Sequence, residues 1–392
     1  ASSVVSMMMM SFGSLGLIGV LWIVYGYAIS FANASDKGFI GIESVIGISP
    51  GKLFMNDALL AAKGGDGFPF AFGGFQGTFA IITVALISGA IADRAKFGSW
   101  MLFAGLWATL VYFPVASWVF NFTVKDGKIV SGGWLVHEVG LLDFAGGTVV
   151  EIASGASALA VALVVGKRFG FTKGMHAPHN VPLVLIGAAI LLFGWFGFNA
   201  GSETAADGIA SLAFVNTLAA PVGGMLSWGL FEKLKHGKAT SVGIATGAVA
   251  GAVAITPSCA YLDPLWSLVL GAIVGVVCAI AIEAKYRFGF DDSLDVVGVH
   301  LVAGLIGTMY IGLFSMQAGL FFGHGFEQLG RQAIGCLSVG LFAFAMSWLI
   351  ATAIQKTIGF RVTSTDEIAG VDLVQHGELA YSGNDPRWKW RG

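Results

Sequence analysis

Two ionisable side chains, Glu151 and His300, lie inside long apolar stretches of this chain. Glu151 follows Asp143 by eight residues in DFAGGTVVEIASG, which on a helix places it about 12 Å further along the axis. His300, in DDSLDVVGVHLVAG, lies at a similar depth measured from the opposite end of its own stretch. Ionisable groups at membrane depth are rare and usually face a cavity or one another. A carboxyl and an imidazole that meet there can both donate and accept a proton, so the pair predicts a proton relay.

Structural roles compete with a functional one at these polar positions. Asp143 is placed to cap the N-terminus of its helix, and a lone histidine within a helix can be a packing residue. Asp295, which follows Asp291 and Asp292 beside a basic connection, fits a cap or a loop-ordering role. Glu151 is harder to explain structurally, because a buried carboxylate without a partner would lose its charge. The functional interpretation is therefore favoured for Glu151 with His300.

Aromatic side chains recur at helical spacing near these groups. In GWFGFNAGS, Trp195, Phe198 and Ser202 follow i, i+3 and i+7 spacing, so two rings and a hydroxyl share one helix face. Phe75 and Phe79 in GGFQGTFA share a face of another helix. Such stripes usually pack in the core or face lipid, so spacing alone leaves a gate as the less favoured reading.

The composition places the chain in a membrane. Of its 392 residues, 56% are hydrophobic and only 11% are charged, with a mean hydropathy of +0.80. A net charge of -2 without a basic block argues against nucleic acid as a partner. Three isolated cysteines form neither a disulfide framework nor a CxxC metal site, and no cofactor is indicated. The first residues, ASSVVSMMMM, lack the basic start of a signal peptide.

Apolar stretches long enough to cross a bilayer predict an all-α polytopic bundle with ten spans. They run over 3–33, 74–93, 98–120, 143–166, 181–200, 207–234, 239–256, 263–285, 294–315 and 327–358. Alternate connections are basic, and short cytoplasmic loops retain Lys and Arg. The basic connections DRAKFGS, GKRFGFTKG, EKLKHGK and EAKYRFG are therefore predicted to be cytoplasmic, with Lys173 in the second of them. An even number of spans places the C-terminal tail on the same side.

The 57 glycines include small-residue patterns such as GIATGAVAGAVAI at 243–255, which allow close helix packing in lipid. An odd number of spans inverts a second copy, so we expect a first repeat over about 1–200 and an inverted five-helix repeat over about 207–326. DFAGGTVVE in one half and DVVGVHLVAG in the other are the matching segments. The transport domain then ends with the last span at 327–358, and 359–392 forms the tail.

The chain resembles the Amt/Mep/Rh ammonium transporter family, and specifically its prokaryotic Amt branch. The resemblance covers almost the whole sequence through long motifs in the family's order. They are WIVYGYAISF, FQGTFAIITVALISGAIADR, DFAGGTVV, GKRFGF, PHNVPLVLIGAAILLFGWFGFNAGS, LAFVNT, ITPSCAY, DDSLDVVGVH and DLVQHGELAY. It implies a homotrimer in the plasma membrane with one pore per protomer, transporting ammonium or ammonia with methylammonium as an analogue. It also implies a tail that couples protomers and meets a PII-type regulator.

The resemblance also assigns roles to individual residues. Phe79 and Phe198 resemble the paired rings that close the outer pore. Ser202 and Trp195 resemble the outer recruitment site, Asp143 the aspartate that supports it, and His300 the second of two pore histidines.

Three departures from the family pattern bear on these roles. Glu151 stands where the family most often has the first pore histidine, an exchange also found in some fungal members. The family usually has eleven spans, whereas this chain begins at what would be the second. The family's first helix is absent either from the chain as given or from the protein. A recruitment-site tryptophan expected after PVASW is replaced by Phe120, and the insertion NFTVKDGKIVSGG leads to Trp134, so either ring is a candidate to cap the site.

The sequence therefore predicts ammonium uptake by deprotonation at the outer pore, passage of ammonia through an apolar pore and separate transfer of the proton. An ammonium sensor with little flux is the alternative. A membrane enzyme using Glu151 and His300 as acid and base is disfavoured, because no metal cluster or nucleophile motif accompanies them.

Overall fold

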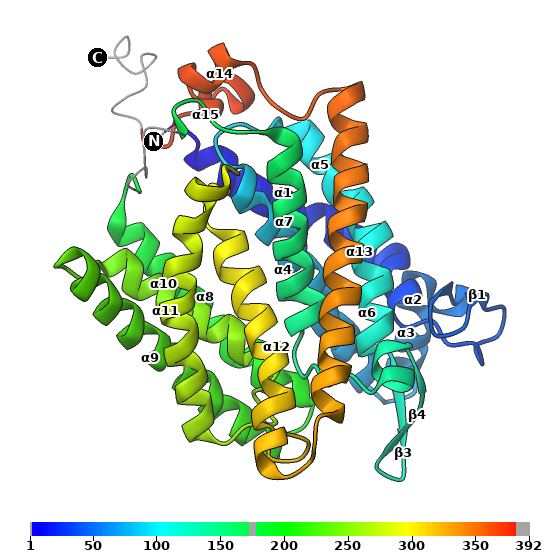
Figure 1. Cartoon of the computed structure of the whole chain (residues 1–392). Coiled ribbons are helices and arrows are strands. Elements are labelled where there is room, and N and C mark those ends of the chain that lie inside the picture. Colours follow the sequence, from blue (N-terminus) through cyan, green and yellow to red (C-terminus); the bar gives the residue numbers. More distant parts are fainter. Residues whose placement is uncertain (1, 172–177, 382–392) are drawn as a thin grey trace.

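A computed structural model describes residues 2–171 and 178–381 and shows an all-α bundle with two short hairpins (Figure 1). Lys173 and the end segment GNDPRWKWRG lie outside the described residues. Nine helices in the described ranges are long and apolar enough to cross a membrane. They are Val4–Ser30, Phe68–Ile91, Phe97–Phe120, Gly147–Val165, Val181–Glu203, Gly208–His236, Pro264–Phe288, Val297–Phe314 and Glu327–Thr357.

The predicted span at 239–256 is shorter than expected. It forms α10, Ser241–Ile255, whose 15 residues fall below the roughly 17 that the shortest spanning helices contain. Turns replace the helix at residues 256–261, and its small residues let neighbouring helices enclose it. The structure thus contains nine helices of spanning length in its described part, where the sequence analysis predicted ten.

Most spanning helices in the first part of the chain are built from several segments. Their bounds are α1 Val4–Leu21, α2 Tyr27–Ser30, α3 Asn56–Lys63, α4 Phe68–Ser88, α5 Phe97–Trp107, α6 Phe113–Phe120 and α7 Ala153–Val165. The hairpins pair β1 Ile40–Ile42 with β2 Ile46–Ile48, and β3 Phe122–Lys125 with β4 Lys128–Gly132. The second hairpin is the insertion found in the sequence.

The second part has longer uninterrupted helices with clear capping signals. The helices are α8 Val181–Ala200, α9 Gly208–His236, α10, α11 Pro264–Phe288, α12 Val302–Phe314, α13 Glu327–Thr357, α14 Ser364–Ala369 and α15 Val371–His376. Asp207, Thr240 and Asp263 each accept hydrogen bonds from the first backbone N–H groups of α9, α10 and α11. Gly237 and Gly289 end α9 and α11 in the left-handed conformation that glycine adopts freely.

Small residues bring α9, α10 and α11 into close contact, as the sequence predicted. A Cβ atom on Gly247 would lie 2.5 Å from the Gly224 carbonyl oxygen, and one on Gly271 would lie 2.0 Å from that of Ala220. Both distances are too short for any real side chain. These helices therefore pack backbone to backbone, which gives the dispersion contacts that hold helices together in lipid.

Five π-helical turns interrupt the described bundle: η1 Trp22–Gly26, η4 Ala108–Tyr112, η5 Leu135–Val139, η6 Gly147–Ile152 and η9 Val297–Leu301. A π turn adds one residue to the helical turn and often marks a functional site. Glu151 lies in η6, which leads into α7, and His300 lies in η9, which leads into α12.

The tail packs against one end of the bundle, where α14 and α15 lie close to the N-terminus (Figure 1). Val362 N–H donates to the Arg94 carbonyl oxygen, and Glu367 bridges the tail to the loop after α7 by accepting from Phe169 N–H. The buried carboxylate of Asp372 accepts from Val5 N–H and Ser6 N–H, so it caps α1. The tail is thereby attached to both the loops and the first helix.

Candidate functional site

Glu151 and His300 meet in the core of the bundle. The Glu151 Oε2 atom lies 2.6 Å from His300 Nδ1, and the two residues are 1% and 7% exposed. An unprotonated ring nitrogen would repel a carboxylate oxygen at that distance, so a proton lies between the two atoms. The sequence prediction that the two groups meet is confirmed by this geometry.

A groove of about 280 Å³ runs alongside Glu151. Its walls are almost entirely apolar, and Glu151 supplies the ionisable group among them. They come from α4, η6 and α8 and comprise Thr78, Ile82, Leu86, Val150, Glu151, Ile190, Leu191, Gly194, Trp195 and Phe198. The groove therefore joins the buried acid to the aromatic face of α8.

Phe79 and Phe198 form a stacked pair at this aromatic face. Their ring centroids are 4.3 Å apart with an interplanar angle of 23°. Phe120 contacts the edge of Phe79 at 6.0 Å, and Phe75 does so at 4.9 Å. Phe79 is 1% exposed, so the stacked rings obstruct any path between them. Of the two candidate capping rings, Phe120 is the one beside this pair.

Trp134 lies elsewhere in the described structure. Its ring packs against Trp118 at 5.7 Å, and its backbone N–H donates to the Ser44 carbonyl oxygen of the first hairpin loop. Trp118 in turn donates its indole N–H to the Val45 carbonyl oxygen. The two tryptophans thus attach the second hairpin to the first, and Trp134 does not contact the stacked pair.

Trp195 and Ser202 flank Phe198 on the same helix, as their spacing predicted. The Trp195 ring lies 5.8 Å from Phe198, and its indole N–H donates to Thr256 Oγ1 at 2.9 Å. The Ser202 hydroxyl donates to the Phe198 carbonyl oxygen at 2.7 Å. Because the only hydroxyl proton is used in that bond, the lone pairs of Ser202 Oγ are left to accept from a donor.

Asp143 caps the helix that carries Glu151. Its carboxylate accepts from the backbone N–H groups of Gly146, Gly147 and Thr148, and also from the Thr148 hydroxyl. These N–H groups have no partner within the helix, so the carboxylate satisfies them and favours the helix dipole. The predicted capping role is confirmed, and the cap explains why η6 begins at Gly147, later than the predicted start at 143.

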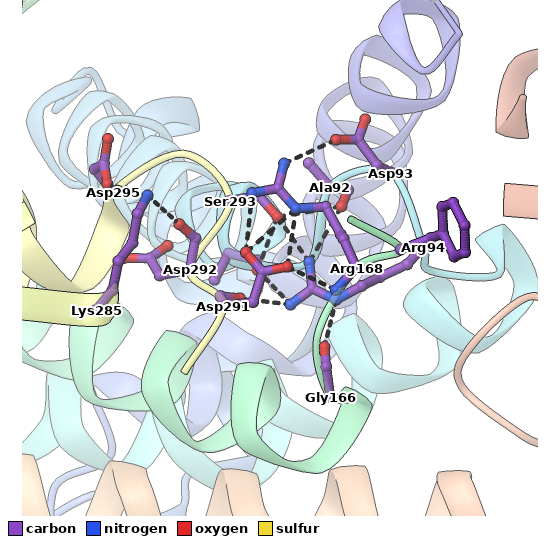
Figure 2. Close-up of polar contacts among 12 residues, drawn as sticks. Ala92, Asp93, Arg94, Gly166, Arg168, Lys285, Asp291, Asp292, Ser293 and Asp295 are labelled. Atoms are coloured by element: carbon purple, nitrogen blue, oxygen red, sulfur yellow. Dashed lines mark hydrogen bonds and ion pairs between the residues drawn. The ribbon is translucent and has the colours of Figure 1, made fainter. Parts of the chain in front are cut away.

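Asp292, rather than Asp295, performs the same capping for the helix that carries His300. Asp292 accepts from Val296 N–H and Val297 N–H at 3.1 and 2.7 Å, and it precedes His300 by eight residues, as Asp143 precedes Glu151. Asp295 instead pairs with Lys285 Nζ at 2.5 Å (Figure 2). Of the two roles predicted for Asp295, the structure therefore shows loop ordering and not capping.

Burial shifts the ionisation of these loop carboxyls. Burial raises the pKa of Asp292 to about 6, and the neighbouring Asp295 charge adds to the effect. Burial also raises the pKa of Asp295, against the opposing influence of Lys285. Burial alone would raise the pKa of Asp291, but its hydrogen bonds from Arg168 and the Arg94 charge hold that pKa below its usual value.

Two arginines join three loops at this end of the bundle (Figure 2). Arg94, fully buried, donates to the carbonyl oxygens of Gly166 and Asp291 and to the Ser293 hydroxyl. Arg168 donates to both carboxylate oxygens of Asp291, and its NH1 group lies 3.0 Å from Asp93 Oδ2. The loops that follow α4 and α7 are thereby fixed to the loop that precedes η9.

Sequence reasoning missed several of these residues. The eight-residue spacing of Asp292 to His300 was a signal that could have identified the second cap. Thr256 and the arginine network carried no comparable signal, because their partners lie far away in the sequence.

A polytopic bundle with a buried acid–imidazole pair beside stacked aromatic rings defines a membrane protein with a pore-like polar centre. The chain belongs to the ammonium transporter family, because the model described as "Ammonium Transporter Family" matches residues 1–381. It is a multi-pass membrane transporter of ammonium and not an enzyme.

Similar proteins extend over nearly the whole chain. An ammonium transporter of Mycobacterium tuberculosis (strain ATCC 25618 / H37Rv) is 46% identical over 407 residues, covering 97% of this chain and 84% of the relative. Ammonium transporter Amt1 of Archaeoglobus fulgidus is 41% identical, covering 96% and 91%. Among solved structures, a Sensor Amt Protein has a TM-score of 0.84 at 27% identity, covering 96% and 91%, and Candida albicans Mep2 has a TM-score of 0.80 at 32% identity, covering 95% and 82%.

Proposed function

We propose that this protein takes up ammonium by separating the ion into ammonia and a proton. The ion loses its proton at the aromatic mouth, ammonia crosses the apolar groove, and the proton passes through Glu151 and His300. The observation that supports this mechanism best is the 2.6 Å contact of the two buried side chains beside the apolar groove.

The mouth has the chemistry to attract ammonium. Ammonium resembles K⁺ in size and charge but carries N–H donors, and Ser202 offers it acceptor lone pairs. The partly exposed ring of Phe198 can add cation–π attraction of about 0.5–2 kcal/mol, whereas Trp195, predicted for the same site, is buried and lines the groove. These contacts favour a cation that can also donate a hydrogen bond.

The apolar groove favours the neutral molecule. An ion without partners is costly to place among apolar side chains, whereas ammonia pays a much smaller desolvation penalty. K⁺ has no proton to lose, so it has no neutral form that can follow. Net charge then crosses only if the proton uses a separate route, which the Glu151–His300 pair provides.

The family resemblance and the charge pattern extend the proposal to the whole assembly. We infer inverted repeats, supported by the matching cap-to-pore spacing of Asp143 to Glu151 and of Asp292 to His300. The end bearing Arg94, Arg168 and the tail is the cytoplasmic one, in line with the retention of positive charge. The protein is a homotrimer of the plasma membrane, and its tail meets a PII-type regulator.

A sensor with little flux is the second candidate. The similarity to a solved protein named Sensor Amt Protein supports it, at 27% identity. The transporter proposal is preferred because relatives with 46% identity are named ammonium transporters.

Uptake of labelled methylammonium into cells lacking their own ammonium transporters tests the proposal. We expect saturable uptake that unlabelled ammonium inhibits, with cells carrying the empty vector as the control. Protein that is folded in the membrane and binds ammonium, but whose uptake equals that of the control, would support the sensor and contradict the transporter.

A further inference from the structure

Gln332 is a buried amide in α13 whose hydrogen-bonding capacity is fully used. Its Oε1 atom accepts from Leu142 N–H at 3.0 Å, and its Nε2 atom donates to the Leu142 carbonyl oxygen at 2.7 Å. The same Nε2 atom donates to the Thr308 carbonyl oxygen at 3.1 Å, and Oε1 also accepts from Gln328. The side chain is fully buried, and these bonds fix the orientation of its amide.

Both partners of Gln332 belong to segments that carry site residues. Leu142 directly precedes Asp143, the cap of the helix that bears Glu151. Thr308 lies in α12, two turns beyond His300. One side chain from α13 therefore connects the Asp143 loop to the helix that follows His300.

The loop around Asp143 depends on such contacts because it has no regular structure. Its backbone bonds come from separate elements: Leu141 N–H donates to the Leu135 carbonyl oxygen, and Phe144 N–H donates to that of Pro257. Gln332 pairs with both polar groups of Leu142, as a neighbouring strand would. Gln328 adds a bond to the Gly140 carbonyl oxygen at 3.1 Å.

We propose that Gln332, supported by Gln328, is a positioning residue for transport, which sets the placement of the Asp143 loop relative to the helix bearing His300. This inference rests on the proposed function. Loss of the amide leaves both polar groups of Leu142 unpaired and removes the added bond to the Thr308 carbonyl oxygen, so the loop can move away from α12. The cap on η6, and with it Glu151, then shifts relative to His300.

The test is the ammonium-evoked current of proteoliposomes containing the full chain, measured over a range of ammonium concentrations. Gln332→Met keeps the side-chain length and removes all four hydrogen bonds. We expect it to lower the saturating current per folded protein about tenfold, below the roughly hundredfold in rate that an ångström-scale misplacement can cost, with the half-saturating ammonium concentration unchanged because the mouth is intact. Gln317→Met makes the same chemical change at an exposed position and is expected to behave as the wild type.

A purely structural role would lower the amount of folded protein without changing the saturating current of each molecule that folds. An unchanged saturating current per folded Gln332→Met protein would therefore overturn the inference. If that variant does not fold, Gln328→Met decides, because it removes only the outer bonds; a fall of about threefold is expected, and no fall overturns the inference. A wild-type protein without ammonium-evoked current would instead contradict the proposed function.

Discussion

At Glu151 and His300, a single short contact joins an acid and an imidazole through one shared proton. Burial favours the neutral acid beside a neutral imidazole, whereas mutual attraction favours carboxylate beside imidazolium. In both states a proton lies in the contact, so a change at either residue alters the protonation of both. A relay needs this property, because a proton accepted on one side must be released on the other.

Replacing Glu151 tests the relay directly. Glu151→Gln keeps the shape and a hydrogen bond but cannot release a proton, so we expect ammonium-evoked current to fall at least about tenfold while the protein still folds. Glu151→His is expected to retain current with a shifted pH dependence. Currents of both variants across about pH 5 to 8 are the measurement. Wild-type current and pH profile in Glu151→Gln would leave Glu151 as a hydrogen-bonding residue of the groove.

The stacked rings give a second test at this scale. Phe198→Ala removes the partner of Phe79, a loss of about 0.5–1.5 kcal/mol beyond the buried area, and opens the mouth. We expect ammonium conduction to be lost or K⁺ to be conducted as well, with assembly unaffected. Flux of both ions in liposomes, with Phe193→Ala on the exposed face of α8 as control, distinguishes a gate from packing. Unchanged discrimination would assign Phe198 to packing.

The sequence was informative about individual residues where spacing along one helix determines the contact. Trp195, Phe198 and Ser202 lie together as predicted, and Asp143 caps its helix. It could not choose between Phe120 and Trp134, because the hairpin insertion before Trp134 places that ring by tertiary contact with Trp118. Nor could it identify Gln332, whose partners Leu142 and Thr308 are more than twenty residues away.

At the scale of elements, two capped π turns present the two pore residues. Both η6 and η9 begin beside an aspartate that lies eight residues before the ionisable group. The sequence analysis matched the segment that begins at Asp143 with the one that begins at Asp295, because each aspartate comes directly before an apolar run. Hydropathy does not reveal an extra residue in a turn, so it could not show which aspartate caps the helix.

Asp292 makes the stability of this element depend on pH. Because its folded pKa of about 6 is above its usual 3.8, the folded state binds the proton more tightly than the unfolded state does. Its stabilising contribution is complete below about pH 4, falls as pH rises to about 6, and is constant above that. The change is on the order of 3 kcal/mol at most.

Asp292→Asn keeps an acceptor for the cap and removes this titration. We expect the melting temperature of the variant, relative to the wild type, to increase between about pH 4 and 6. Asp295 remains in both proteins, and because its charge helps to raise the pKa of Asp292, the comparison reports the titration of this pair of aspartates. Asp126→Asn in the exposed turn of the second hairpin is the matched control. A difference independent of pH would show that Asp292 titrates normally in the folded protein.

At the scale of the whole molecule, hydropathy predicted all nine helices of spanning length that residues 2–171 and 178–381 contain. It overestimated the length of α10, because the small residues at 239–256 are as apolar as those of a membrane span, although the helix ends at Ile255 and turns follow. The basic connections do lie together: Arg94, Arg168 and the tail share one network, and Lys235 pairs with Glu283 at 2.5 Å near Lys285. Which side of the membrane this end faces stays a prediction.

We expect a trimer when the protein is purified in mild detergent. Large apolar side chains cover the outer face of α9, including Leu226, Leu230 and Leu234, which are 70%, 57% and 79% exposed in the single chain. Such a face can pack against other protomers as well as lipid. Native mass measurement checks this, and a monomeric mass would contradict the assembly inferred from the family.

The π turns have a consequence for how this chain tolerates changes in length. Deleting one residue between 147 and 152 would convert η6 to an ordinary α-helical turn that continues directly into α7. Glu151 or its neighbours would nevertheless rotate by about 100° relative to Asp143, because each α-helical residue turns by that angle. A one-residue deletion there would thus displace Glu151 even where the helix still forms, whereas the same deletion in the exposed hairpin at 122–132 would leave the segment from Asp143 to Glu151 in place.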